Sequence, residues 1–289
     1  MTISDTKTIE ELIDSLDVET PAKEKFLELS KIFRINPIKD TNPNFERGIL
    51  LYSLIAKYRP KNVLEIGTAE GFSAICMAWA MADCAIDGKI FTIDPKPFDS
   101  PIRRINTWDE NTKNEFVFLS TKELWIKFVK KEWLEKIQVL TGYSGKILHK
   151  LSKELPKMDM GYIDGHHAYP AVRHDFHAFL KNSSESFVLL FDDCHTQDVS
   201  KLINDEIKPH FDTTIISTNA HKQKPFKNDV KMCFIESTSL KQPFYQIFPK
   251  NKSEEIINEY LKWEKRWKLR KSLNQKLPFL NKFRFSSNS

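Results

Sequence analysis

Short apolar runs alternate with longer amphipathic segments along most of the chain after residue 60. The apolar runs, which are rich in Val, Ile, Leu and Phe, occupy residues 62–66, 89–94, 137–141, 159–164 and 186–192. The amphipathic segments between them occupy residues 71–84, 120–134, 144–154 and 168–181. Strands that alternate with helices of this length predict right-handed crossovers and a parallel sheet covered by helices on both faces.

Two further strand candidates, 212–217 and 230–236, follow a helix predicted near 196–208. No long helix separates these two strands, so we expect them to form an antiparallel edge of the sheet. The seven strands together predict an α/β fold, with a doubly wound, Rossmann-like and mostly parallel sheet.

The start of the chain is predicted to be helical and to pack beside the sheet. Thr8 with Glu11 three residues later is a capping-box pattern, which marks the start of a helix. Thr20 followed by Pro21 predicts a second helix with Thr20 as its N-cap, and a third is predicted at about 45–58. We divide the chain into three parts: a helical segment packed on the core at 1–58, the sheet domain at 59–250, and a basic amphipathic helix and tail at 251–289.

The connection from Asp94 to Ile137 is much longer than a minimal crossover. It contains the aromatic segment STKELWIKFVKKEWLEK at 120–136. Two interpretations stay open: an extra helix that packs on the domain, or a lid over the site.

The composition is that of an ordinary soluble protein, with 40% hydrophobic and 29% charged residues and a mean hydropathy of −0.44. The longest apolar run, Ala74–Ala82, is about half of the roughly 20 residues that a membrane-spanning helix needs. The N-terminus lacks the apolar core of a signal peptide. Four cysteines without CxxC spacing indicate neither a disulfide framework nor a zinc knuckle. We therefore expect a cytoplasmic protein.

Positive charge is concentrated at the C-terminus. Residues 252–289 hold 10 Lys and Arg against 4 Asp and Glu, and the remaining residues hold 34 against 35. A neutral body argues against a nucleic-acid partner. Ile256, Tyr260, Trp263 and Trp267 form one stripe of a basic amphipathic helix. This helix predicts either peripheral contact with an anionic membrane or packing on the sheet domain or on a second subunit of a homo-oligomer.

Polar residues recur at the points where the predicted strands end. They are Glu65 and Gly67, Asp94, Gly142 to Ser144, Asp164, and Asp192 with Asp193. Ligands of doubly wound sheets bind outside the carboxyl ends of the strands. Because five strand ends share this feature, we expect an active site at that edge.

The stretch GTAEG at 67–71 lacks the middle glycine of the dinucleotide fingerprint GxGxxG. The helix N-terminus that follows it offers backbone N–H groups to an anion such as a carboxylate, and Glu65 before it suits a cationic ligand. Asp94 lies 23 residues past Gly71, where an acid can bind a ribose diol. Alone, the glycines could serve only as turn hinges; with Asp94 they indicate a cofactor that contains a nucleoside.

VLEIGTAEGFSA at 63–74 and FTIDP at 91–95 resemble the first motif and the ribose-binding acid of class I S-adenosylmethionine (SAM)-dependent methyltransferases. YIDGHHAYPAVRHDFHAFL at 162–180 and VLLFDD at 188–193 are similar to the metal-dependent macrolide-sugar O-methyltransferases of the macrocin and mycinamicin type, a branch that includes cephalosporin-hydroxylase-like proteins. The resemblance spans about residues 60–195 and implies the seven-stranded methyltransferase sheet.

The resemblance implies a SAM site on the loop after the first strand of the domain. It places Glu65, Gly67 and Ser73 around the methionine part of SAM. Asp94 would hold the ribose hydroxyls, and Ser144 would lie near the adenine. The full set of cofactor-binding residues is then Glu65, Gly67, Thr68, Gly71, Ser73, Asp94 and Ser144.

The same resemblance implies that Asp164, Asp192 and Asp193 bind Mg²⁺ or another divalent cation and that His167 is the general base. A sugar hydroxyl has a pKa of about 16, near that of water, and a bound cation lowers such a value by many units. Mg²⁺ is held by a few carboxylates and keeps open positions. The acid pair favours the sugar branch, because catechol enzymes have Asp-Asn there. The glycine pair expected before the fifth strand is replaced by NSSES at 182–186.

Simpler interpretations stay open for several of these residues. A strand-end Asp such as Asp164 often only caps the next helix, and His166 is expected to be a bystander. The apolar stripe of the helix at 168–181 leaves His174 and His177 on its other face, where we expect them to be solvated. A zinc site from these two with Cys194 and His195 is a weaker alternative, and His195 is the reserve candidate for the base.

The function that these observations predict is a SAM- and divalent-metal-dependent O-methyltransferase that acts on a hydroxyl of a sugar or glycoconjugate. An NAD-dependent oxidoreductase is one alternative, which the missing glycine disfavours. The other is a non-catalytic module attached by the basic tail to a membrane or a glycan-assembly complex. The expected partners are a small-molecule or glycan acceptor, with peripheral membrane contact and homo-oligomerisation left open.

Overall fold

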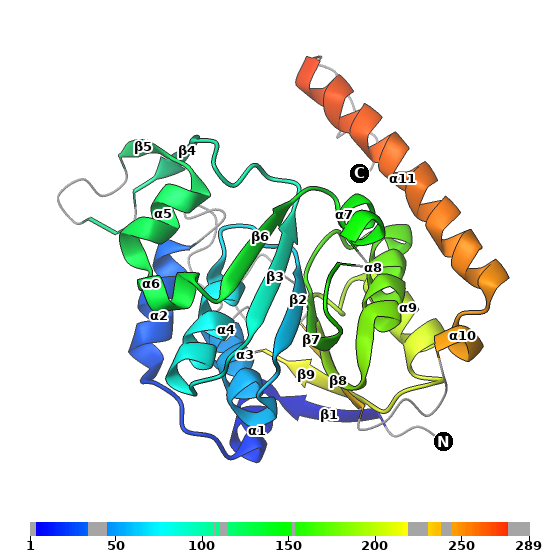
Figure 1. Ribbon diagram of the computed structural model, residues 1–289, viewed down its shortest axis with the longest axis horizontal. Helices are drawn as coiled ribbons and strands as arrows, with labels where there is room; N and C mark the ends of the chain where they lie inside the picture. Colours follow the sequence, from blue (N-terminus) through cyan, green and yellow to red (C-terminus); the bar gives the residue numbers. More distant parts are fainter. Residues whose placement is uncertain are drawn as a thin grey trace, which may run out of the picture.

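The computed structural model describes residues 4–33, 45–106, 108–109, 115–151, 154–218, 231–237 and 244–276 (Figure 1). The end of the predicted C-terminal tail, 277–289, lies outside the described residues. The main sheet contains β1 (Ser4–Thr8), β2 (Asn62–Ile66), β3 (Lys89–Asp94), β6 (Ile137–Thr141), β7 (Met158–Ile163), β8 (Ser183–Phe191), β9 (Thr213–Ser217) and β10 (Lys231–Ser237). A separate hairpin contains β4 (Ile102–Ile105) and β5 (Phe116–Leu119).

The main sheet has the order β1-β9-β10-β8-β7-β2-β3-β6. β8, β7, β2, β3 and β6 run parallel to one another, and β10 is antiparallel to both β8 and β9. The predicted doubly wound, mostly parallel sheet is confirmed. The predicted edge is wrong in one respect: β1 pairs in parallel with β9, so the N-terminal segment supplies an eighth strand and β9 is internal.

The helices are α1 (Ile9–Leu16), α2 (Lys23–Ile32), α3 (Phe45–Tyr58), α4 (Phe72–Asp83), α5 (Thr121–Phe128), α6 (Lys131–Leu134), α7 (Ser144–Leu151), α8 (Tyr169–Asn182), α9 (Gln197–Leu202), the π-helix η1 (Ile203–Ile207), α10 (Phe244–Ile247) and α11 (Lys250–Lys276). The predicted capping box at Thr8 and Glu11 is present. Thr20 is not an N-cap, because Ala22 still has an extended ψ of 137° and α2 begins only at Lys23.

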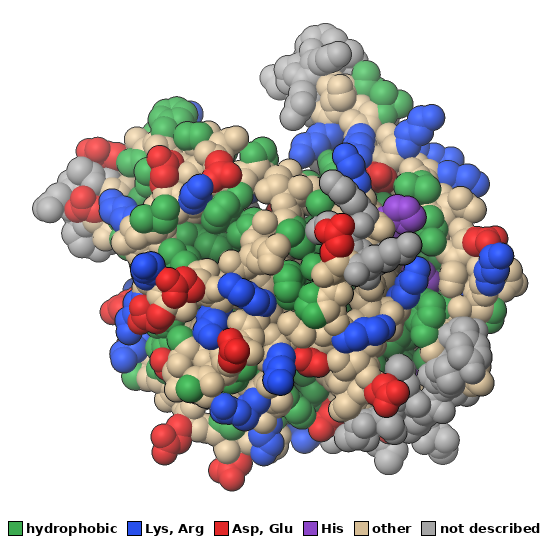
Figure 2. Space-filling view, viewed as in Figure 1, with side chains coloured by type: hydrophobic (Ala, Val, Ile, Leu, Met, Phe, Trp, Pro, Cys, Tyr) green, Lys and Arg blue, Asp and Glu red, His purple; other side chains and the backbone are tan. Residues whose placement is uncertain are grey.

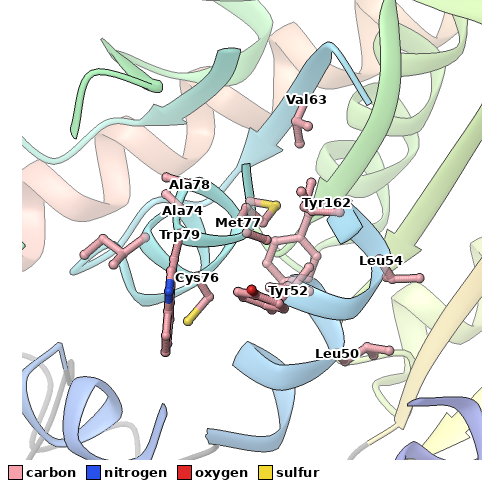
Figure 3. Close-up of a cluster of buried hydrophobic side chains, with 14 of the residues drawn as sticks. Leu50, Tyr52, Leu54, Val63, Ala74, Cys76, Met77, Ala78, Trp79 and Tyr162 are labelled. Atoms are coloured by element: carbon pink, nitrogen blue, oxygen red, sulfur yellow. The ribbon is translucent and has the colours of Figure 1, made fainter. Parts of the chain in front are cut away.

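Each strand of the parallel core contributes side chains to two apolar layers, as alternation along a strand requires. Val63, Met160 and Tyr162 face the layer that contains α3 and α4, whereas Leu64 and Ile163 face the layer that contains α8 and α9. Figure 3 shows the ring of Tyr162 from β7 among side chains of α3 and α4. Glu65 lies two residues after Val63 on the same strand, so its side chain is on the same face and also points toward α3 and α4.

The long connection between β3 and β6 forms the hairpin β4–β5 followed by α5 and α6, and it packs on the domain. The predicted single helix at 120–134 is interrupted because Val129 has an extended ψ of 137°. Trp133 of α6 stacks on Trp79 of α4, with ring centroids 4.9 Å apart, and Trp125 of α5 is buried. These contacts show the packing function of the segment; movement as a lid stays a prediction.

The C-terminal helix α11 lies along the outside of α8, on the opposite side of the molecule from the hairpin (Figure 1). Ile256 and Tyr260 of the predicted stripe are buried there. His174 and His177, expected to be solvated, are also buried: His174 stacks on Tyr260 and His177 contacts Ser253 at 3.1 Å. The expectation is wrong because α8 is covered on two sides, by the sheet and by α11. In the described part of the chain, no helix has the length and apolar character needed to cross a membrane.

Candidate active site

Backbone hydrogen bonds connect neighbouring loops at the carboxyl edge of the parallel strands. The N–H of Gly67 donates to the carbonyl of Ile93 at 2.9 Å, and the N–H of Asp164 donates to the carbonyl of Ile66 at 2.8 Å. In the same way, the N–H of Asp192 donates to the carbonyl of Ile163 at 3.0 Å. The loops after β2, β3, β7 and β8 therefore lie side by side, as the strand ends in the sequence predict.

Gly67 is the point where the loop after β2 meets the loop after β7. Its φ is +105°, a value that favours glycine. A Cβ atom at this position would lie 2.0 Å from the carbonyl oxygen of Asp164. Only a residue without a side chain lets the two loops approach this closely, so Gly67 joins the predicted cofactor loop to the predicted metal loop.

Gly71 begins α4 beneath the indole of Trp125. Its φ is +97°, and a Cβ atom there would lie 2.1 Å from that ring. Trp125 Nε1 donates to the carbonyl of Glu70 at 2.8 Å. The glycine-rich loop is thus covered by the segment that the sequence leaves open between a lid and a packing helix.

Glu65 is fully buried and accepts hydrogen bonds from the hydroxyls of Ser73 and Thr92. Thr68 lies beside it, with its hydroxyl 2.5 Å from that of Thr92. Burial raises the pKa of Glu65 to about 7, although both hydroxyl donors oppose the change. A carboxyl group in this environment would gain most from a cationic ligand, such as the ammonium group of an amino acid.

Because the pKa of Glu65 is raised, we expect Glu65→Gln to stabilise the chain more at high pH than at low pH. Between pH 4.5 and 7 the folded chain keeps a proton that the unfolded chain releases, so the contribution of Glu65 to stability falls as the pH rises through this window. Above pH 7, burial of the ionised Glu65 carboxylate lowers the free energy of unfolding by an amount on the order of 3 kcal/mol. We expect a higher melting temperature for Glu65→Gln at pH 8 and a smaller difference at pH 5, measured by calorimetry without ligand. The exposed variant Glu185→Gln serves as the control, and a pH-independent difference would contradict the assignment.

Asp94 organises the loop in addition to any role toward a ligand. One carboxylate oxygen accepts from the N–H of Ala69 at 2.9 Å, and the other accepts from the N–H of Lys96 at 2.7 Å. Ala69 has a φ of +50°, which the hydrogen bond to Asp94 helps to hold. Each carboxylate oxygen has further lone-pair capacity for a ribose hydroxyl.

Glu70 connects the glycine-rich loop to the hairpin, and sequence reasoning missed it. It is buried and forms ion pairs with Lys96 at 2.5 Å and with Arg104 of β4. Arg104 also donates to the hydroxyl of Thr121 at 2.9 Å. Since Arg104 lies 34 residues away in a short hairpin, no sequence spacing indicates this ion pair.

Ser144, predicted to lie near the adenine of SAM, begins α7 after β6. Its hydroxyl donates to Asp175 of α8 at 2.6 Å. Tyr260 of α11 accepts from the N–H of the next residue, Gly145, at 3.3 Å. This serine is thus held by α8 and α11, and its role toward adenine stays a prediction.

The predicted metal and base residues lie on the loops after β7 and β8. Nε2 of His167 is 3.2 Å from Asp193 Oδ2 and 3.8 Å from Asp164 Oδ1. In the described chain, Asp164, His167 and Asp193 are the one group of three whose potential ligand atoms all lie within 4.8 Å of one another. The alternative zinc set of His174, His177, Cys194 and His195 does not form such a group among these residues.

Asp192, the third predicted ligand, lies outside this group. Arg47 Nη1 donates to Asp192 Oδ2 at 2.6 Å and to Asp164 Oδ2 at 3.0 Å. The hydroxyl of Tyr162 donates to the same Asp192 oxygen at 2.8 Å, and the N–H of Asp193 donates to the other oxygen at 2.8 Å. The carboxylate of Asp192 is therefore already bound on both oxygens, and a cation that used it would compete with Arg47.

Burial and mutual repulsion set the electrostatics of the cluster. Burial and the charges of its acidic neighbours raise the pKa of Asp193 to about 6 and also raise the pKa of Asp164. Burial acts in the same direction on Asp192, but the Arg47 guanidinium outweighs it and lowers that pKa. The neighbouring Asp164 carboxylate raises the pKa of His167. Two carboxyl groups with raised pKa values favour binding of a cation or a proton between them.

The two neighbouring histidine candidates take different positions. His166, the expected bystander, turns away and packs edge-on against Trp263 and Trp267 of α11. His195, the reserve base, has Nδ1 3.7 Å from Asp193 Oδ1. His167 is therefore the histidine that faces both Asp164 and Asp193, as the Asp-x-x-His spacing predicts.

Part of the sheet domain is similar in sequence to a known protein family. Residues 64–194 match the model of the family described as "Methyltransferase domain". These residues, which make up less than half of the chain, are therefore similar to a methyltransferase domain. The match runs from β2 to the residue after Asp193, so it contains the glycine-rich loop, Asp94, and the carboxylate cluster. Among curated proteins, no sequence matches the chain.

Solved structures are similar to this chain at low sequence identity. The O-methyltransferase TomG from Streptomyces achromogenes, involved in tomaymycin synthesis and solved with SAM, is 17% identical with a TM-score of 0.50, covering 80% of this chain and 96% of its own. An O-methyltransferase from Bacillus cereus in complex with SAH is 18% identical with a TM-score of 0.48, covering 78% and 96%. At this level the TomG match supports the Rossmann-like fold alone.

The donors in the carboxylate cluster fit a divalent cation. Nε2 of His167 is buried and has no hydrogen-bond partner among the described residues, although carboxylate oxygens of Asp164 and Asp193 lie beside it. Two carboxylates and an imidazole suit several divalent metals, and carboxylates alone suit Mg²⁺. Asp164 and Asp193 would be the ligands, because both oxygens of Asp192 already accept hydrogen bonds, whereas Oδ1 of Asp164 faces His167.

Proposed function

We propose that the chain transfers a methyl group from SAM to a hydroxyl of a sugar or glycoconjugate with the aid of a divalent cation. One observation carries the proposal: Gly67 brings the glycine-rich loop into direct contact with the loop that bears Asp164 and His167. A cofactor on the first loop and an acceptor on the second would lie next to each other. Such positioning is most of what a methyl transfer from an activated sulfonium requires.

The residues of the first loop would bind and orient SAM. The buried Glu65 carboxylate would accept hydrogen bonds from the ammonium group of its methionine part, and the ammonium charge would favour the ionised form of Glu65. Asp94 would accept hydrogen bonds from the ribose hydroxyls while it holds Ala69 in place. The start of α4 at Gly71 presents backbone N–H groups that suit the carboxylate of the methionine part.

The residues of the second loop would activate the acceptor. Asp164 and Asp193 would hold the divalent cation, which lowers the pKa of a hydroxyl bound to it. SAM would supply the methyl group, whose bond to sulfur would break with its electron pair on sulfur as the acceptor oxygen bonds to the carbon. Nε2 of His167 would accept the hydroxyl proton. One nitrogen cannot bind a cation and accept a proton together, so the proposal assigns the cation to the carboxylates and the proton to His167.

Calorimetry and mass spectrometry test the proposal. We expect the full chain to bind SAM and not NADH, and to add one methyl group to a member of a panel of sugars and glycoconjugates. EDTA should abolish the product and Mg²⁺ should restore it. Clear NADH binding without SAM binding would replace the proposal with an oxidoreductase, and turnover that EDTA leaves unchanged would remove the cation from it.

A further inference from the structure

A groove of about 340 Å³ opens between the start of α8 and the middle of α11. Its walls combine aromatic and cationic side chains, namely Tyr169, Lys262, Trp263, Arg266, Trp267 and Arg270. Glu259 is the one acidic residue in the lining, and its carboxylate accepts from Arg173 at 2.9 Å. The groove is therefore positively charged and partly apolar.

The aromatic wall contains two tryptophans of α11, one of which is exposed to solvent. Trp263 and Trp267 lie one helical turn apart with their rings nearly parallel, at an interplanar angle of 12° and a centroid distance of 6.2 Å. His166 packs edge-on against both rings at 4.7 and 4.5 Å and fixes their position. Trp267 nevertheless keeps 37% of its surface exposed. The exposed part of this indole pair offers apolar surface to the C–H groups of a sugar ring.

The cationic wall carries charge that the described chain does not neutralise. Lys262, Arg266 and Arg270 follow each other at intervals of four residues, so they lie on one face of α11, where like charges destabilise a helix. Among the described residues, no carboxylate forms an ion pair with these three, whereas Lys268 of the same helix pairs with Glu264 at 2.8 Å. Figure 2 shows Lys and Arg side chains gathered along α11.

The groove adjoins the proposed active site through two consecutive residues. His166 contacts the groove tryptophans, and His167 faces Asp164 and Asp193. Consecutive Cα atoms are about 3.8 Å apart. The histidine that packs on the groove tryptophans and the histidine proposed as the base are therefore neighbours on one loop.

We propose that the groove binds the anionic part of the methyl acceptor, which makes the acceptor an acidic glycan or glycoconjugate. Its carboxylate, phosphate or sulfate group binds the guanidinium groups of Arg266 and Arg270, which match such oxyanions with paired N–H donors. A sugar ring of the acceptor lies on Trp263 and Trp267. This inference rests on the proposed methyl transfer and adds the charge of its substrate.

Binding experiments on the full chain test the inference with defined probes. Tetragalacturonate and maltotetraose have the same length and differ in charge, inorganic phosphate tests the anion alone, and vesicles of phosphatidylcholine with and without phosphatidylglycerol test a lipid surface. Calorimetry and tryptophan fluorescence report binding, and SAM binding is measured separately. The test variant is Arg266→Ala with Arg270→Ala; the matched control, Lys265→Ala with Lys271→Ala, removes the same charge from α11 outside the groove lining.

We expect tetragalacturonate to bind about 10-fold or more tightly than maltotetraose, and the arginine variant, but not the lysine control, to lose that preference. Equal affinity for the two oligosaccharides would overturn the inference, as would an equal loss of the preference in both variants. If the chain still bound SAM, the methyl-transfer proposal would be unaffected by either result. Binding to anionic vesicles or to phosphate without binding to tetragalacturonate would also overturn it. Charge-selective glycan binding by a chain that does not bind SAM would support the groove and refute the methyl transfer.

Discussion

Replacing His167 with Gln is expected to lower kcat for methyl transfer by about 10²- to 10⁴-fold, the range typical for loss of a general base. Glutamine keeps a polar side chain of similar reach but cannot accept the hydroxyl proton. Because the proposal assigns the cation to Asp164 and Asp193, the affinity for Mn²⁺ and for SAM should change little. Calorimetry for both ligands and mass spectrometry for the product measure the two effects separately.

The matched control for this variant is His195→Gln. His195 lies 3.7 Å from Asp193 on another side of the cluster and is the other histidine that could take the proton. Activity lost in His195→Gln and kept in His167→Gln would move the base to His195. A large loss of Mn²⁺ affinity in His167→Gln would instead make that imidazole a metal ligand.

Replacing Arg47 with Ala is expected to destabilise the chain in EDTA by a few kcal/mol, because it leaves the buried Asp192 carboxylate without its cation. The same change removes the competitor for the carboxylates, so Mn²⁺ should bind more tightly than to the parent. Melting temperatures with and without Mn²⁺ measure both effects. The variant should start lower and gain more from the metal.

Arg59→Ala is the control for the Arg47 variant, since Arg59 donates to a backbone carbonyl far from the cluster. A loss of stability in Arg47→Ala that Mn²⁺ does not reduce would show that Arg47 has a structural role only. In that case Arg47 would belong to the site as a permanent counter-ion, and Asp192 would not be available to a cation.

The sequence predicts the parallel core and the strand-end residues well because both depend on local pattern. The apolar runs at 62–66, 89–94 and 137–141 match β2, β3 and β6 at both ends. Asp164, His167 and Asp193 meet because adjacent parallel strands end at one edge, which follows from the order of strands and helices alone.

The sequence could not predict features that depend on distant packing. Arg47 lies 117 residues from Asp164, on a helix outside the resemblance, and no spacing indicates that they touch. His174 and His177 lie opposite the apolar stripe of α8 and would be exposed if α11 did not cover them. β1 is missed because its polar sequence SDTKT gains strand structure only by pairing with β9.

The contact between Gly67 and Asp164 has an energetic consequence for the two ligands. The backbone of the proposed cofactor loop touches the backbone of the loop that bears the proposed cation ligands, so we expect binding at one site to change the affinity of the other. Heterotropic coupling of this kind is reciprocal: the factor by which the cofactor raises cation affinity equals the factor by which the cation raises cofactor affinity. Gly67 is therefore the residue through which we expect the two binding equilibria to be coupled.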